Sequence, residues 1–562
     1  MSYCRRLGAL VIGLLLMASP VLADDAAAGL EGFDLSEVRL LAIQQGGRLK
    51  PLDTFCREAV RLITGKEQFQ GSDPVAVVLR WWSSDEAALA EPNVEIRNLA
   101  LKRQLGLPEE KRWFSHRELS GNPALKELQE AIHAKHRTEE ELSGTEDEAS
   151  EVLVKMQLLK MIADGAALTI LPNPGGLEHP WGDLTLLRNP QIASAMAPVG
   201  QAVKQLEQAV VSSQPEEFSR AAASLRDQLA SMGPYPATGD LARETHFNQF
   251  HAFRKAWILY LAGFLCLFFA DPRKRGTLYW IGLSIACFGF ALHAYGFYLR
   301  CVIAGRPPVT NMYESVIWVG FGAVLFSLIF EFIYHARNYL LASTAGAVVC
   351  LILADTLPAV LDPSIKPLTP VLRNNFWLTI HVLTITLGYA AFLMSLGLGH
   401  MVVWKHITGP VAKDDPGADV VLKARKAELK SLTTALYKAL QVGVLLLAAG
   451  TILGGVWANY SWGRFWGWDP KEVWALIALL GYLAILHARY AGWVGNYGMG
   501  AWSIVAFQGV LMAWYGVNFV LGAGLHSYGF GDGGNQWVYA YVGLEMLFVA
   551  LASVRYRKLR GG

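Results

Sequence analysis

The feature that most constrains this chain is a series of long apolar segments that runs from about residue 255 to residue 554. A helix needs about 20 predominantly apolar residues to cross the hydrocarbon core of a bilayer. Most of these segments reach that length, and the charged residues are concentrated between them. The sequence therefore predicts an all-α, polytopic transmembrane bundle within residues 255–562, with eight or nine spans at residues 256–270, 277–299, 315–334, 339–361, 376–401, 438–457, 472–491, 500–521 and 536–554.

The first 250 residues have a different character. Arg5 and Arg6, an apolar run and a small-residue site before Asp24 are typical of a signal peptide over residues 1–23 that is cleaved after Ala23. An uncleaved membrane anchor is the alternative. Residues 24–250 are mixed and charged, with helical patterns at 126–136 and 202–232. They predict a mainly helical soluble domain that is exported to the outer side of the membrane.

The positions of lysine and arginine predict the orientation of the bundle. Connections with an excess of these residues remain on the cytoplasmic side. Every second connection is basic, and the residues concerned are Arg273, Lys274, Arg275, Arg337, those of the 405–430 segment, Arg489, and Arg555, Arg557, Lys558 and Arg560. We therefore expect the exported domain and the loop at residues 457–474 to share the outer side of a bacterial inner membrane. The formal charge of +2 says nothing about nucleic acid, and the sequence has no basic stripe or helix-turn-helix pattern, so we set the nucleic-acid-binding class aside.

The loop between the predicted sixth and seventh spans is rich in tryptophan. Residues 462–474 read WGRFWGWDPKEVW, so Trp462, Trp466, Trp468 and Trp474 form an aromatic platform on which a flat apolar ligand would stack. Arg464 is placed to meet an anionic group of such a ligand. Two structural alternatives stay open: tryptophans anchor loops at membrane surfaces, and Asp469 begins the next helix as its N-cap, with Pro470 at N1 and Glu472 at N3.

This loop resembles the tryptophan-rich signature of heme-handling proteins in cytochrome c biogenesis, the WWD domain. Three further segments extend the resemblance in the same order along the chain: RPPVTNMYES at 306–315, LLGYLAILHARY at 479–490 and GLHSYGF at 524–530. Together they resemble the CcsA (ResC) family of the System II pathway over residues 255–562. The resemblance implies a protein that moves heme to the outer face of the cytoplasmic membrane and presents it at this platform.

The resemblance also implies a reaction and its partners. Cysteine thiols of an exported apocytochrome c, in a CxxCH motif, would add to the vinyl groups of heme b. The expected partners are the CcsB (ResB) membrane protein, with which a CcsA protein acts as a cytochrome c synthase, the apocytochrome, and thiol-reducing proteins. This chain has no CxxC of its own, so any heme that it holds is bound without a covalent link.

Three of the thirteen histidines are candidate iron ligands. His381 lies about five residues, or roughly 7 Å, inside the fifth span from its outer end, and His526 lies in the glycine-rich outer loop. Both match the external heme ligands of the family. His487 lies deep in the seventh span, where an ionisable group is costly and therefore functional by default; it matches a transmembrane heme ligand whose opposite ligand comes from CcsB. His293, in the second span, is interpreted as structural, with Tyr313 or Glu314 as its expected partner.

Two other functions remain possible from the sequence. A heme exporter or chaperone without ligation activity would carry the same residues. A membrane redox subunit with b-type hemes usually pairs histidines at two depths of the same helices, and none of the predicted spans has two histidines deep in the membrane.

Overall fold

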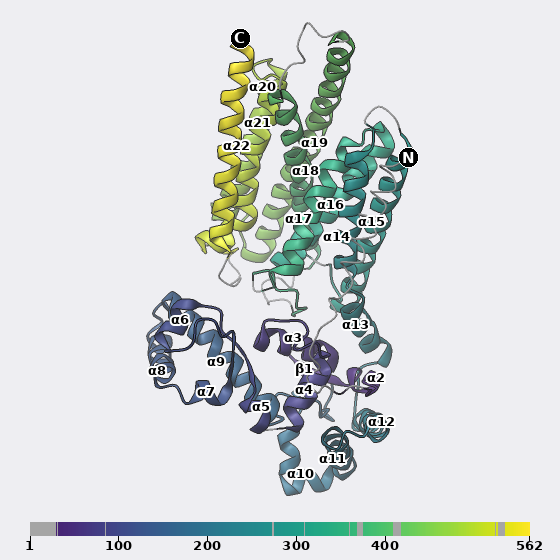
Figure 1. Cartoon of the computed structure of the whole chain (residues 1–562), viewed down its shortest axis with the longest axis vertical. Coiled ribbons are helices and arrows are strands. Elements are labelled where there is room, and N and C mark those ends of the chain that lie inside the picture. The colour runs from purple at the N-terminus through teal and green to yellow at the C-terminus, as the bar shows by residue number, and fades with distance from the viewer. Residues whose placement is uncertain are drawn as a thin grey trace. The chain divides into compact units, whose positions relative to one another are not determined.

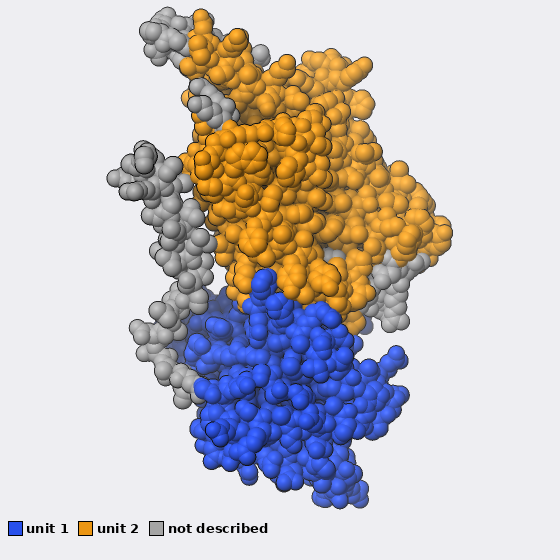
Figure 2. All heavy atoms as spheres, turned by 90° about the vertical axis from the view of Figure 1, so that its right-hand side faces the viewer, with its two compact units in different colours: residues 1–250 blue, residues 251–562 orange. Residues whose placement is uncertain are grey.

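The computed structural model of the chain describes residues 30, 32–84, 86–271, 275–307, 309–358, 360–367, 375–408, 418–522, 524–526 and 534–561. The predicted signal peptide, residues 1–23, lies outside them. The chain divides into two compact units, residues 1–250 and 251–562, which Figure 2 shows in different colours.

The first unit consists of helices and two short two-stranded sheets around an apolar core. Trp81, Phe55 and Phe114 are among its fully buried side chains. Strands β1 and β2 pair antiparallel, and so do β3 and β4. In chain order the elements are α2 (Ser36–Arg39), β1 (Ala42–Gln45), β2 (Arg48–Pro51), α3 (Leu52–Thr64), α4 (Pro74–Ser83), α5 (Glu86–Ala90), β3 (Pro92–Glu95), α6 (Leu99–Gln104), β4 (Trp113–Ser115), α7 (His116–Ser120), α8 (Pro123–Thr138), α9 (Gly144–Ala163), η1 (Leu184–Arg188), α10 (Pro190–Ala195), α11 (Ala197–Val211), α12 (Pro215–Ser231) and α13 (Thr238–Phe250).

Local sequence explains where several of these helices begin. The Ser143 hydroxyl accepts a hydrogen bond from the Glu146 amide while the Glu146 carboxylate reaches back to the Ser143 amide, which forms a capping box for α9. One expectation is wrong: the pattern at 202–232 forms two helices, α11 and α12, instead of one. Ser213 adopts a left-handed φ of 52°, and Pro215 then occupies the first turn of α12, where its missing N–H costs nothing.

The second unit is a helical bundle. Its helices are α14 (Ala252–Phe269), α15 (Thr277–Ala304), α16 (Met312–Tyr334), α17 (Asn338–Thr356), α18 (Asn375–Ile407), α19 (Ala418–Trp462), α20 (Pro470–Tyr490), α21 (Asn496–Leu511) and α22 (Asn535–Gly561). Among the described residues, nine helices are long and apolar enough to cross a membrane. The predicted all-α polytopic fold is therefore confirmed. The predicted span at 339–361 is too long, because α17 ends at Thr356, before the Leu357-Pro358 pair in which proline disfavours helical backbone.

Helix α18 is the central element of the bundle (Figure 1). It packs against α16, α17, α19, α21 and α22. Glycines bring two of these neighbours very close: a Cβ atom at Gly388 would lie 3.0 Å from the Leu447 amide nitrogen of α19, and one at Gly399 would lie 3.0 Å from the Gly500 carbonyl of α21. Small residues at such crossings let helices in a bilayer pack through close van der Waals contact.

A buried ion pair fixes the connection between α15 and α16. The Arg300 guanidinium lies 2.8 Å from the Glu314 carboxylate, and both side chains are almost fully inaccessible to solvent. Arg300 also donates to the carbonyl oxygens of Pro363 and Ser364, while the second carboxylate oxygen of Glu314 accepts from the Thr310 amide. Because every charge is partnered, this pair holds residues 309–315 in place, and breaking it would leave a charge buried alone.

We expect Glu314→Ala to destabilise the second unit by about 3–5 kcal/mol, since it leaves Arg300 buried without its counter-ion. Lys366→Ala is the matched control, because it removes a solvent-exposed pair with Asp362 at 2.7 Å, and such pairs contribute about 1 kcal/mol or less. Thermal unfolding of the detergent-solubilised protein measures both effects. Equal shifts in the two variants would contradict a stabilising role for the buried pair.

Candidate functional site

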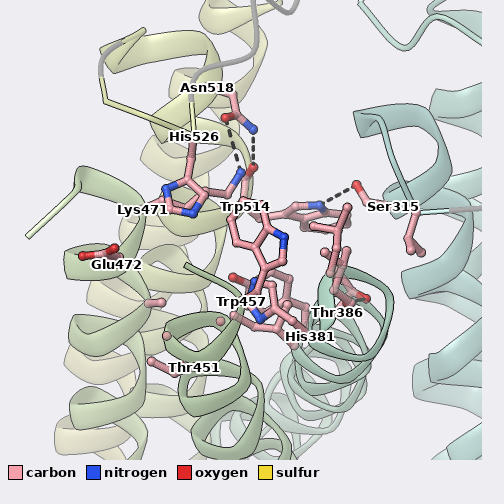
Figure 3. Close-up of a pocket in the computed structure, with 18 of the residues that line it drawn as sticks. Ser315, His381, Thr386, Thr451, Trp457, Lys471, Glu472, Trp514, Asn518 and His526 are labelled. Carbon is pink, nitrogen blue, oxygen red and sulfur yellow. Dashed lines mark hydrogen bonds between the residues drawn. The ribbon is translucent and has the colours of Figure 1, made fainter. Parts of the chain in front are cut away.

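A large cavity lies in the second unit, between the start of α16 and helices α18, α19 and α20 (Figure 3). It contains about 1090 Å³ of space free of protein atoms, part of it open to solvent. Small-molecule sites are mostly apolar with a few placed polar groups. The lining fits that description, because aromatic and aliphatic side chains such as Met312, Tyr389, Trp457, Trp466 and Trp514 surround two histidines, one lysine and one glutamate.

His381 enters the cavity from α18 with a defined tautomer. Its Nδ1 lies 2.7 Å from the Gly450 carbonyl oxygen of α19. A carbonyl only accepts, so the ring hydrogen is assigned to Nδ1 and Nε2 keeps its lone pair. The ring needs the space beside Gly454, where an added Cβ would lie 2.6 Å from its Cε1 atom. His381 is therefore oriented as a histidine whose Nε2 is available to a metal.

His526 is oriented in the same way by a carboxylate. Its Nδ1 lies 2.8 Å from Asp469 Oδ1, with the Asp469 side chain almost fully buried and that of His526 mostly buried. The imidazole ring packs edge-on against Trp462, with ring centroids 4.9 Å apart. Both candidate ligands of the outer iron, His381 and His526, thus line one cavity and have Nδ1 engaged.

Asp469 connects the start of α20 to the segment that contains His526. As N-cap it accepts from the Lys471 amide at 3.0 Å, and its second oxygen accepts from the Leu525 amide at 2.6 Å. Burial opposes ionisation, but the hydrogen bond from His526 and the backbone donors outweigh it and lower the pKa of Asp469 to about 2. The capping interpretation is confirmed, and the same carboxylate also orients a candidate ligand.

The tryptophans of the platform have different surroundings. Trp466 lines the cavity, and its buried indole Nε1 has no hydrogen-bond partner among the described residues. Trp462 contacts Trp457 and His526. Trp468 has a left-handed φ of 58° and is 71% exposed, while Trp474 is partly buried and is not among the residues that line the cavity.

The two cations of the loop also differ. The Arg464 guanidinium lies 3.2 Å from the Glu472 carboxylate and over the Trp462 ring, and it is not one of the lining residues. Lys471 does line the cavity, and its Nζ donates to Asn518 Oδ1 at 3.3 Å. The sequence made Arg464 the candidate for an anionic group of a ligand; of the two cations, Lys471 is the one that lines the cavity.

His487 is separate from this cavity. It lies on an exposed face of α20, and its Nδ1 is 2.7 Å from the Leu483 carbonyl one turn earlier. His293 is fully buried as a structural residue would be, but its Nδ1 partner is the Tyr260 hydroxyl at 3.2 Å instead of the expected Tyr313 or Glu314.

Sequence reasoning missed several residues of the cavity. Trp514 and Asn518 line it from the segment Met512–Leu521, where α21 continues as a wider π-helix. The Trp514 Nε1 donates to the Ser315 hydroxyl of α16 at 2.9 Å. The available signal in the sequence was that Trp514 and Asn518 lie four residues apart in an otherwise apolar span. Wider π-helical turns of this kind are frequent at functional sites.

Replacing Asp469 by Ala should loosen two backbone segments at once, because it removes the acceptor of both the Lys471 and the Leu525 amides. Loss of an N-cap costs about 0.5–2 kcal/mol, so hydrogen–deuterium exchange of both amides should accelerate. Glu472→Gln is the comparison, since Glu472 accepts from the amides of Gly467 and Asp469; it should leave Leu525 unchanged. An unaltered Leu525 amide in Asp469→Ala would contradict the connection.

Comparison with known proteins agrees with the position of the cavity. The family model described as "Cytochrome C assembly protein" matches residues 309–526, which include the lining residues from Val309 to His526. The chain is 30% identical to protein NrfI of Wolinella succinogenes over 512 residues, which is 86% of this chain and 53% of NrfI. It thus spans about half of the length of that relative.

Shorter relatives match a smaller share of the chain. The cytochrome c biogenesis protein CcsA of Synechococcus sp. is 38% identical over 249 residues, which cover 41% of this chain and 78% of that protein. CcsA of Chlorella vulgaris is 33% identical over 261 residues, which cover 41% of this chain and 80% of that protein. Since most of the length of these relatives is matched at such identity, the chain belongs to the CcsA family of cytochrome c biogenesis proteins.

Proposed function

We propose that this protein receives heme b, holds its iron between His381 and His526, and presents it on the outer side of the inner membrane for attachment to the CxxCH motif of an exported apocytochrome c. The observation that carries the proposal is the pair of imidazoles in one cavity. Each comes from a separate part of the chain, and each has Nδ1 bonded to an acceptor, so that Nε2 is available. Metal-binding histidines have this arrangement.

The remainder of the cavity suits a large, flat and mostly apolar substrate. Aromatic rings from the loop and from α19 line it, and the buried Nε1 donors of Trp457 and Trp466 have no partner in the described part of the chain. Buried donors normally have an acceptor, so a bound substrate with acceptor groups would satisfy them. The name of the family, and of the CcsA relatives, supports heme as that substrate.

The proposed attachment needs positioning more than acid–base chemistry. In thioether formation a cysteine S–H adds across a vinyl double bond: a C–S bond forms, the hydrogen of the thiol goes to the other vinyl carbon, and nothing leaves. The thiols must be reduced beforehand, which is the proposed role of thiol-reducing partner proteins. His381 and His526 would fix the substrate, and its vinyl edge would face the opening toward the apocytochrome.

His487 supports a second, transmembrane heme position shared with a partner. Its side chain is exposed on α20 instead of facing the cavity, and its Nδ1 is engaged by the Leu483 carbonyl. We propose that a separate CcsB (ResB) protein covers this face and supplies the opposite ligand. Heme would then pass from this position to the outer cavity.

Substitution by glycine tests the outer pair. His381→Gly or His526→Gly should abolish cytochrome c maturation in cells and should regain part of it when imidazole is added, because imidazole fills the gap on the open side of the cavity. Formation of covalent cytochrome c is the readout. If imidazole fails in both variants while the folded protein still has a six-coordinate outer heme, other residues bind the iron.

His487→Ala should lower the heme content of the outer cavity as well, since heme would lose its earlier position on the route. A several-fold loss is expected, in line with the cost of removing groups that support a metal site. His133→Ala, in the first unit, is the control and should retain heme. Normal heme content and normal maturation in His487→Ala would exclude this residue from the route.

A further inference from the structure

The two charged residues that line the cavity differ in the groups that they bond to. Of the described residues that line it, Lys471 is the one lysine or arginine, and Glu472 is the one carboxylate. Glu472 is engaged outside the cavity, because its oxygens bond to Arg464 and to the amides of Gly467 and Asp469. Lys471 therefore sets the sign of the charge that a ligand meets inside.

Lys471 Nζ is held by an amide and not by an acid. Either orientation of the Asn518 amide gives Nζ an oxygen acceptor, at 3.3 or 3.1 Å, and the second orientation also lets Asn518 donate to the His526 carbonyl at 3.2 Å. The nearby Asp469 carboxylate is directed to His526 and to the Lys471 and Leu525 amides. An ammonium group has three donors, so one amide oxygen leaves donor capacity at the cavity wall (Figure 3).

A cation in a mostly apolar cavity is costly unless an anion accompanies it. The partner that fits is a carboxylate carried by an amphipathic ligand, since such a group would enter together with an apolar body that the aromatic lining accepts. We propose that Lys471, instead of Arg464, binds a propionate carboxylate of the heme. This inference rests on the proposed function and adds the residue that recognises the acidic edge of the substrate.

The position of Lys471 gives this contact a second effect. In the orientation in which Asn518 donates to the His526 carbonyl, Lys471, Asn518 and His526 form one connected set. The substrate's carboxylate and the iron ligand would then be held at a fixed separation. A porphyrin with a free carboxylate would be oriented in the cavity, whereas one without it would be free to rotate about the iron axis.

The test compares hemin with hemin dimethyl ester, in which both propionates are blocked, on the purified full chain stripped of heme. The unaltered protein should bind hemin about tenfold or more tightly than the ester, as expected for hydrogen bonds to a charged group. Lys471→Gln should lose this preference while its affinity for the ester and its six-coordinate absorption spectrum remain. Lys471→Arg should keep most of the preference. Lys438→Gln is the control, because Lys438, on α19, lies over the ring of Tyr334 at the end of α16 and does not line the cavity.

Other variants separate the alternatives. If Lys471 only holds Asn518 in place, Asn518→Ala should lose the preference for hemin as Lys471→Gln does. Under the proposal, the Asn518→Ala protein keeps a preference for hemin over the ester. Loss of the preference in Arg464→Gln but not in Lys471→Gln would overturn the assignment. If neither porphyrin gives a six-coordinate spectrum in the unaltered protein, the proposed function fails; an unchanged preference in Lys471→Gln with a normal spectrum refutes only the role of Lys471.

Discussion

The hydrogen bonds of the Asp469 carboxylate are the interaction on which the site depends. One oxygen caps α20 and bonds to the imidazole of His526, and the other accepts from the Leu525 amide. A single side chain thus joins the tryptophan-rich loop to a segment more than fifty residues later. Without it, the imidazole of His526 would be oriented mainly by its packing against Trp462, and apolar packing resists rotation of a ring poorly because it is not directional.

The elements around the cavity differ in how firmly their neighbours hold them. Residues 309–315 are fixed by the buried Arg300–Glu314 pair, and α18 is held by close crossings at Gly388 and Gly399. His381 is therefore presented by a closely packed helix, which would suit the proposed metal site. By contrast, Trp468 is exposed in a left-handed conformation, so the loop meets solvent with a large aromatic surface.

Much of the bundle was predictable, because length and hydropathy decide which segments cross a bilayer. The lateral order of the helices was not, since it depends on close contacts such as that of Gly399 with Gly500. In the site, the cap at Asp469 followed from a local pattern, whereas His381 and His526 were candidates because of their predicted positions and the family resemblance. The different positions of Arg464 and Lys471 did not follow from such a pattern: Arg464 lies in the loop before α20 and pairs with Glu472, whereas Lys471 lies in the first turn of α20 and lines the cavity. Trp514 was missed because a π-helical turn changes the face on which residues of a span lie.

The cavity is assembled from distant parts of the chain, and this has a consequence for biosynthesis. Its walls come from α16, α18, α19, α20 and the segment after α21, and His526 follows them all. During insertion, His381 enters the bilayer long before its counterpart is synthesised. A nascent chain that stops before residue 526 would present one imidazole and an incomplete wall, so its affinity for substrate would be low. On the proposed function, the order of synthesis would keep unfinished protein from capturing heme.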